Sequence, residues 1–140
     1  MADVSVAMRR RDMPGHIREG YGCVTPRLIT RDVAGLVAFI RSVSDASGDG
    51  VPERPVELRI GDSLIMVSDG GGARDAMPAM LYVYVLDVDR TFQLAQDAGA
   101  EVIEEPGDMP WGDRRATVAD RWGNVWQIAT ACDPGPRVGT

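Results

Sequence analysis

The sequence carries one arrangement of segments twice, at an interval of about 50 residues. In each half, an apolar stretch is followed by an Asp-Val pair, a helical pattern and further strand-forming residues. The two pairs are Asp32-Val33 and Asp87-Val88. Aspartate is a favourable helix N-cap because its carboxylate accepts hydrogen bonds from the first backbone N–H groups of the helix. One such unit leaves a face of its sheet uncovered, so two units must combine.

The first half has the pattern of a strand, a helix and a hairpin. Pro26 indicates an edge strand or a ladder position that needs no N–H, because proline donates no ladder hydrogen bond. Apolar side chains then recur at a helical spacing until residues 42–44, and Gly61-Asp62 marks the turn of the hairpin. The predicted segments are the strand 20–30, the helix after Asp32, the loop 45–55 and the hairpin 56–69.

The second half repeats this plan and adds a strand. Asp87 or Asp89 caps the helix, Gly99 ends it, and Pro106-Gly107 ends the additional short strand. The predicted segments are the strand 80–86, the helix ending at Gly99, the strand 100–105 and the two strands 114–119 and 124–130.

Composition and charge argue against several classes of function. The net charge is -6, so the chain lacks the basic surface that binding to DNA or RNA requires. All 15 basic residues are arginine, which excludes Schiff-base chemistry and a phosphate-loop lysine. One histidine and two cysteines are too few for a zinc cluster or a disulfide scaffold. With no long apolar run and no secretory signal, we expect a cytoplasmic protein without a membrane or nucleic-acid partner.

Four stretches, in this order, resemble the vicinal oxygen chelate superfamily, also called the glyoxalase, bleomycin-resistance and dioxygenase family, and within it the PhnB-like branch. They are GYGCVTPRLIT, ELRIGDSLIMVSD, LYVYVLDVD and WGDRRATVADRWGNVWQIAT. The resemblance covers nearly all of residues 20–130. It implies an α+β fold of two βαβββ modules, whose curved mixed sheets surround a ligand cavity and which commonly pair in a homodimer.

We therefore expect one structural domain at residues 16–132. The predicted parts are a disordered tail at 1–15, a first βαβββ-like module at 16–69, a Gly-rich linker at 70–79, a second βαβββ module at 80–132 and a tail at 133–140. Between Phe39 and Glu57 the chain is short for this branch, and Gly48-Asp49-Gly50 and Pro52 stand where a strand is expected. One strand of the first module is therefore expected to be missing or vestigial, which would leave an open sheet edge for a partner chain.

Members of this family often hold a divalent metal with one side chain from each of four strands. The resemblance places these positions at Thr25, Glu57, Leu81 and Gln127. Leu81 has no donor atom and Thr25 is a poor ligand, whereas Mg, Mn or Zn needs several carboxylate or imidazole donors. We therefore expect neither a metal nor another cofactor.

Side chains alternate along a strand, so residues in phase with these four positions are expected to line the cavity. Arg27 and Arg59 offer guanidinium groups to a ligand carboxylate or phosphate, or are merely solvated. Glu57 is the candidate catalytic base, or else a partner in a salt bridge. The out-of-phase aromatic residues are expected in the core; they are Tyr82, Tyr84 and Trp126.

A loop that borders the pocket in this family adds two candidates. Trp111 can stack on a planar ligand with Arg114 as its polar complement, or it can close the core. The complete set of ligand-binding candidates is Thr25, Arg27, Arg59, Leu81, Trp111, Arg114 and Gln127.

Three functions remain open. The first is a metal-free protein that binds a mid-sized organic molecule, such as an antibiotic or a biosynthetic intermediate. The second is a metal-independent enzyme of secondary metabolism (an isomerase, cyclase or lyase) in which Glu57 moves a proton and an arginine stabilises an oxyanion. A metal-dependent lyase or dioxygenase is the third, and it requires ligands that this chain lacks. The expected partners are a small molecule and a second copy of the chain.

Overall fold

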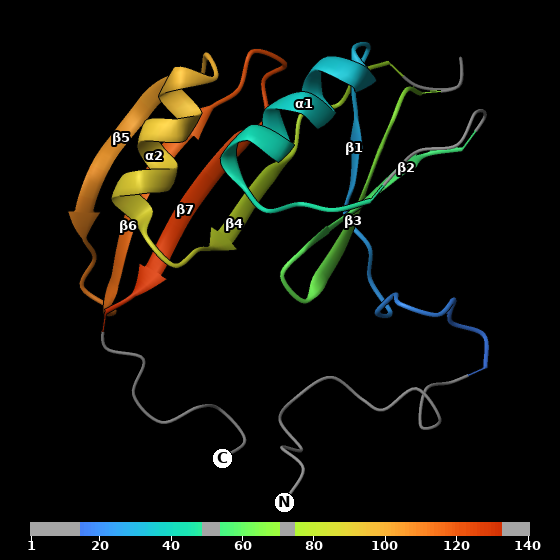
Figure 1. Ribbon diagram of the computed structural model, residues 1–140, viewed down its shortest axis with the longest axis horizontal. Coiled ribbons are helices and arrows are strands. Elements are labelled where there is room, and N and C mark those ends of the chain that lie inside the picture. Colours follow the sequence, from blue (N-terminus) through green and yellow to red (C-terminus); the bar gives the residue numbers. More distant parts are fainter. Residues whose placement is uncertain (1–14, 49–53, 71–74, 133–140) are drawn as a thin grey trace, which may run out of the picture.

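The structure, a computed structural model, describes residues 15–48, 54–70 and 75–132 of the 140 in the chain. Within these residues it contains a three-stranded and a four-stranded sheet, both mixed, and two helices (Figure 1). The predicted α+β fold is confirmed. No helix in the described residues is long and apolar enough to cross a membrane. The predicted tails, apart from Gly15, lie outside the described residues, as does part of the predicted linker.

The first sheet has the strand order β1-β3-β2. β1 (Arg27–Ile29) pairs in parallel with β3 (Ser63–Ser68), which pairs antiparallel with β2 (Val56–Ile60). The predicted hairpin is therefore confirmed. Its turn places Gly61 at a φ of 59°, a conformation that glycine adopts without strain.

The second sheet has the order β4-β7-β6-β5, which matches the first sheet apart from the additional β5. Its β4 pairs in parallel with β7, and the other pairs are antiparallel. The strands are β4 (Met80–Tyr84), β5 (Glu101–Asp108), β6 (Asp113–Ala119) and β7 (Val125–Ala131). The sequence repeat thus corresponds to two sheets of equivalent topology.

The second strand of the first module, expected between the helix and the hairpin, is reduced to a single bridge among the described residues. Ser47 lies beside Arg59 of β2, and their backbones exchange hydrogen bonds of 3.1 and 2.8 Å. Residues 49–53, which were also expected to lack a strand, lie outside the described residues. Among the described residues, the first sheet thus has one strand fewer than the second, as the sequence predicted.

Two predicted strands differ in extent from the observed ones. Pairing in the first module starts only after Pro26, rather than at residue 20, because proline cannot donate to the ladder. In the second module, β5 continues through Pro106-Gly107 to Asp108. Irregular register along β5 accommodates the proline at this sheet edge.

The two helices begin at the predicted caps. α1 (Val33–Val43) starts at Asp32, whose side chain accepts the N–H of Gly35 at 3.0 Å. α2 (Val88–Asp97) starts at Asp87, whose side chain accepts the N–H of Arg90 at 3.2 Å. Each carboxylate thus satisfies an N–H group that has no partner within its helix.

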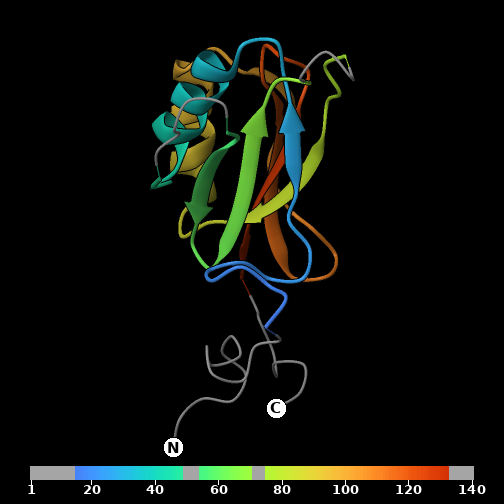
Figure 2. The ribbon, with the colours of Figure 1, turned by 90° about the vertical axis from the view of Figure 1, so that its right-hand side faces the viewer.

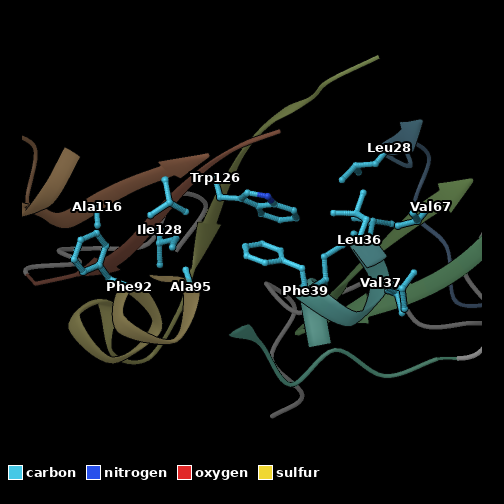
Figure 3. Packing of buried hydrophobic residues seen from close by; sticks show 14 of the residues in the cluster. Leu28, Leu36, Val37, Phe39, Val67, Phe92, Ala95, Ala116, Trp126 and Ile128 are labelled. Atoms are coloured by element: carbon cyan, nitrogen blue, oxygen red, sulfur yellow. The ribbon is translucent and has the colours of Figure 1, made fainter. Parts of the chain in front are cut away.

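Both helices cover the same side of the sheets, and α1 lies between the two sheets (Figures 1 and 2). α1 directs Leu36 toward the first sheet and Phe39 toward Trp126 of the second, as Figure 3 shows. Fully burying a leucine or phenylalanine side chain stabilises a fold by about 1.5–3 kcal/mol. One helix therefore serves both modules, and the buried residues form a single core cluster. We call the opposite side of the sheets the open face.

The turn between β6 and β7 ties the second module to the start of α1. The indole of Trp122 donates to the Asp32 carboxylate at 3.1 Å and lies edge-on to Phe39. The turn itself is held by the buried Asp120 carboxylate, which accepts the backbone N–H groups of Trp122 and Asn124, each at 2.9 Å. The helix cap is therefore also a contact between modules.

We expect Gly35→Ala to destabilise the protein, although an exposed Gly→Ala change in a helix normally stabilises it by up to about 1 kcal/mol. A methyl group at this position would lie 2.7 Å from Trp122 Cζ2 and would collide with the Asp32 carboxylate. Loss of the cap alone costs about 0.5–2 kcal/mol. Urea unfolding should show a loss of about 1–2 kcal/mol. The exposed Gln96→Ala on α2 should stay within about 0.5 kcal/mol. A stability of Gly35→Ala at or above wild type would contradict the contact.

Candidate functional site

The open face brings equivalent residues of the two modules to corresponding places. On the first sheet, Arg27 and Glu57 lie on either side of Met66. On the second sheet, the strand register places Tyr82 and Thr117 on either side of Gln127. The side chains of both trios point away from the helices, because their neighbours along each strand are the core residues.

The second sheet carries three exposed aromatic side chains held by one buried carboxylate. Asp113 Oδ2 accepts the Tyr82 hydroxyl at 2.6 Å, the Tyr84 hydroxyl at 2.9 Å and Trp111 Nε1 at 3.2 Å. Asp113 is only 5% exposed, whereas the three aromatic residues are 39%, 62% and 59% exposed in the same order. We call Tyr82, Tyr84 and Trp111 the aromatic platform.

These hydrogen bonds also set the protonation states of the platform. The hydrogen bond from Tyr82, followed by those from Tyr84 and Trp111, holds the pKa of Asp113 below its ordinary value, although burial acts in the opposite direction. Burial and the bond to Asp113 raise the pKa of Tyr82, and the bond to Asp113 raises that of Tyr84. At neutral pH the platform therefore has one anion accepting from neutral phenols, which fixes the rings and leaves part of their surface in solvent.

Arg115 extends the platform toward the sheet edge. Its guanidinium lies 5.3 Å from the centre of the Trp111 ring and donates to Glu104 at 2.9 and 3.1 Å. Thr117 also donates to Glu104, at 2.9 Å. The bond from Arg115 is the main cause of the lowered pKa of Glu104. This side of the face thus combines an aromatic surface with a paired, half-buried arginine.

Arg115, and not the predicted Arg114, is the arginine that lies beside Trp111. Arg114 lies on the helix-covered side, where it donates to Asp89 of α2 at 3.0 and 2.9 Å and to Asp108 at 3.4 Å. Its expected place beside the pocket is therefore wrong. Side chains alternate along β6, and Ala116 is fully buried on the side of the helices. Arg114 is in phase with Ala116, whereas Arg115 is not. The apolar residue at position 116 was therefore the signal in the sequence that could have identified Arg115 as the residue on the open face.

The expected phase of β4 is also wrong. Leu81 packs against the core cluster rather than lining a cavity. Tyr82 and Tyr84, which were expected in the core, point to the open face. Residues 80–86 are apolar or aromatic at every position, so alternation in polarity could not reveal the phase. The prediction for Trp126 is confirmed, since its ring is buried and its Nε1 donates to Asp120 at 2.9 Å.

On the first sheet, the two predicted site residues of β2 hold the segment before β1. The Tyr21 hydroxyl donates to Glu57 in a short hydrogen bond, and Arg59 donates to the carbonyl oxygen of Gly20 at 2.7 Å. Burial, followed by the bond to Glu57, raises the pKa of Tyr21. Arg27 donates to Ser68 at 3.0 Å. Glu57 therefore faces the open side, but its carboxylate already accepts a hydrogen bond from the Tyr21 hydroxyl.

A hollow of about 340 Å³ opens between this segment and the first sheet. It lies within the size range of small-molecule sites. Thr25, one of the predicted ligand contacts, lines it together with Tyr21 and Met66. A second hollow, of about 30 Å³, lies in the apolar core between helices and strands and has room for no organic ligand.

The four metal positions implied by the resemblance do not suit a divalent ion here. Leu81 lacks a donor and faces the core, and Thr25 lies before β1. Glu57 and Gln127 remain, and Glu57 is hydrogen-bonded to Tyr21. Within residues 15–48, 54–70 and 75–132, no group of three or more His, Cys, Asp or Glu side chains could hold a metal ion.

We expect the pKa of Asp113, followed by carbon-13 NMR of its carboxyl group, to lie below its ordinary value of about 3.9. Ionised Asp113 then contributes stability that is present above about pH 4 and is lost as pH falls through the folded-state pKa. Tyr82→Phe keeps the ring but removes the strongest donor, so it should raise this pKa toward 3.9. Tyr21→Phe, whose hydroxyl contacts Glu57 instead, should leave it unchanged. Equal values in wild type and Tyr82→Phe would contradict the network.

The fold resembles solved structures over most of its length. TioX from Micromonospora sp. ML1 matches with a TM-score of 0.67 and 24% identity, over 77% of this chain and 97% of TioX. A glyoxalase/bleomycin resistance protein/dioxygenase family enzyme from Burkholderia phytofirmans PsJN matches with a TM-score of 0.66 and 21% identity, over 75% and 94% of the two chains. At these identities the likeness concerns the fold.

Sequence comparison gives the family. The uncharacterized protein Mb0911c of Mycobacterium bovis is 31% identical over 122 residues, covering 75% of this chain and 80% of that protein. The sequence model of the Glyoxalase/Bleomycin resistance protein/Dioxygenase superfamily matches residues 52–128, which is more than half of the chain. The match spans β2 to β7 and agrees with the two-module fold. The chain belongs to the glyoxalase/bleomycin resistance protein/dioxygenase superfamily.

Proposed function

We propose that this chain is a small-molecule-binding protein that holds a planar, mid-sized organic ligand against the aromatic platform of the open face. The observation that carries this proposal is the attachment of three exposed aromatic side chains to one buried carboxylate, Asp113. Binding of this kind needs no metal and no catalytic group. An antibiotic or a biosynthetic intermediate has the size and shape required.

The platform suits a planar ligand because its rings are fixed before binding. Tyr82 and Tyr84 meet edge to face, with centroids 5.5 Å apart, and both hydroxyls are held by Asp113. Ordering a flexible side chain on binding costs about 0.5–1.5 kcal/mol. The hydrogen bonds to Asp113 already order these rings in the free protein, so most of that free energy is not lost on binding. Aromatic contacts contribute about 0.5–1.5 kcal/mol beyond the area that they bury.

Polar groups beside the platform can orient the ligand. Gln127 lies next to Tyr82 across β4 and β7, and its amide has no hydrogen-bond partner among the described residues. Arg115 takes the role that the sequence assigned to Arg114, because it is the arginine that lies against Trp111. Such a mixture of apolar surface and a few polar groups is typical of small-molecule sites.

A metal-independent enzyme is the second candidate, and the Tyr21–Glu57 pair favours it. A carboxylate and a phenol in a short hydrogen bond on the open face could pass a proton to or from a bound ligand. Glu57 would be the base, and it could act only after the phenol moves away. A metal-dependent lyase or dioxygenase is the third candidate; stoichiometric Mn, Fe, Ni or Zn in the purified protein would contradict the metal-free proposals.

We further propose a cytoplasmic homodimer of the PhnB-like branch that acts in antibiotic resistance or secondary metabolism. The dimer is supported by the edge of β4, which has no strand partner among the described residues, and by the edge of β2, where only Ser47 of the described residues pairs. A second copy could pair with these edges. Light scattering at micromolar concentration should therefore give twice the mass of the chain, and a monomer would contradict the dimer.

We expect the neutral fluorescent probe N-phenyl-1-naphthylamine to bind the platform with a saturable rise in fluorescence. Trp111→Ala should weaken binding at least tenfold, which corresponds to about 1.4 kcal/mol. The matched control is Leu86→Ala, because Leu86 is 99% exposed and lies outside the platform. It should bind as wild type does. Equal affinities in the two variants, or the absence of saturable binding, would contradict the platform as the ligand site.

The same samples separate binding from catalysis once a candidate metabolite replaces the probe. Mass spectrometry after long incubation should recover the metabolite unchanged. Conversion that disappears in Glu57→Gln would favour the enzyme with Glu57 as base. Conversion that survives in Glu57→Gln would contradict both the binding-only proposal and the assignment of the base.

A further inference from the structure

The segment before β1 forms a second recognition surface, separate from the aromatic platform. It lies at the end of the first sheet where β1 begins (Figure 2). Tyr21 and Gly20 anchor it through Glu57 and Arg59 of β2. These contacts hold the hollow of about 340 Å³ open between the segment and the sheet.

Both polar and apolar groups line this hollow. Ile17 and Met66 supply apolar surface, and the remaining contacts come from polar or small residues. The complete lining is His16, Ile17, Arg18, Tyr21, Gly22, Cys23, Thr25 and Met66. A compact molecule with one polar end would match such a lining.

The charged groups around the hollow are mainly cationic. Arg18 lines it, and both Arg18 and Arg54 lie close enough to the Tyr21 hydroxyl to favour its ionised form, although burial and Glu57 outweigh them. Among the described residues, neither arginine side chain has a hydrogen-bond or ion-pair partner, and neither does the His16 ring. Of the carboxylates in this region, Glu57 already accepts the Tyr21 hydroxyl, and Glu19 follows Arg18 in the segment. In a chain with a net charge of -6, these two unpaired arginine side chains are a local exception.

We propose that this hollow binds the carboxylate or phosphate group of a small organic acid, with Arg18 and His16 facing the anion and Met66 contacting the apolar part. Arginine is suited to this role because its fixed donors match the oxygens of carboxylates and phosphates. The inference rests on the proposed function in taking the open side as the ligand-binding side. It adds a chemical class of ligand, a small organic acid, and a second set of ligand contacts on the open side.

The single histidine of the chain, His16, makes a direct test possible, because its ring Hε1 proton gives one NMR signal that no other residue of this type can obscure. Benzoate and phenyl phosphate should each shift this signal saturably, whereas neutral benzamide should not. A tighter response to one of the two acids identifies carboxylate or phosphate as the preferred group. A benzamide response equal to that of benzoate, or no saturable response to either acid, would overturn the proposal.

Variants test the role of arginine in the same titration. Arg18→Ala should weaken binding of the preferred acid at least fivefold, since hydrogen bonds to charged groups are among the stronger ones. Arg90→Ala is the matched control, because Arg90 is an exposed arginine on α2. It should bind as wild type does. Equal affinities in the two variants would contradict the assignment of Arg18.

A second measurement uses the unaltered protein. Cys23 lines the hollow, whereas Cys132 follows β7, and both are exposed free thiols. The ratio of alkylation rates with anionic iodoacetate and neutral iodoacetamide reports the local potential at each thiol. This ratio should be higher at Cys23 than at Cys132, and the difference should shrink in high salt. A ratio at Cys23 equal to or below that at Cys132 would overturn the proposal.

Different experimental results would contradict the two proposed sites. Loss of N-phenyl-1-naphthylamine binding with a retained response of His16 to acids would contradict the aromatic platform and leave the anion site standing. Probe binding that depends on Trp111, with no response of His16 to either acid, would contradict the anion site alone.

Discussion

The packing of α1 between the two sheets is the constraint on which the rest of the structure depends. This helix supplies side chains to both modules, so the core of the described residues lies on one side of the sheets. The opposite side must then be stabilised without a helix to cover it. The contact of Trp122 with Asp32 adds to the same arrangement, since it joins a turn of the second module to the cap of α1.

The open face meets this requirement with hydrogen bonds rather than with apolar packing. Asp113 gathers three aromatic donors on the second sheet, and Glu104 gathers Arg115 and Thr117 beside them. On the first sheet, Glu57 holds Tyr21. A buried carboxylate such as Asp113 is costly unless it is well hydrogen-bonded. Asp113 and the partly exposed Glu57 and Glu104 all accept hydrogen bonds, and these bonds fix other side chains in place. The same bonds that stabilise the face therefore prepare it for a ligand.

Most of the fold could be predicted from the sequence because its signals are local. The caps Asp32 and Asp87, the turn at Gly61 and the missing strand of the first module are all visible in short stretches. The candidate site was harder to predict from the sequence. Leu81 was placed on the wrong face because an entirely apolar strand carries no phase, and Asp113 had no distinguishing signal before Tyr82 and Tyr84 were known to reach it. Tyr21 reaches Glu57 from a segment that contains no regular structure, so only the fold reveals that contact.

The central claim is that a ligand lies on the rings that Asp113 fixes. The most direct measurement is the set of intermolecular nuclear Overhauser effects between a bound planar ligand and the aromatic protons of the protein. We expect contacts from the ligand to Trp111 and to Tyr82 or Tyr84, and none to Trp126, which is buried against α1. A bound ligand whose contacts avoid all three platform residues would contradict it.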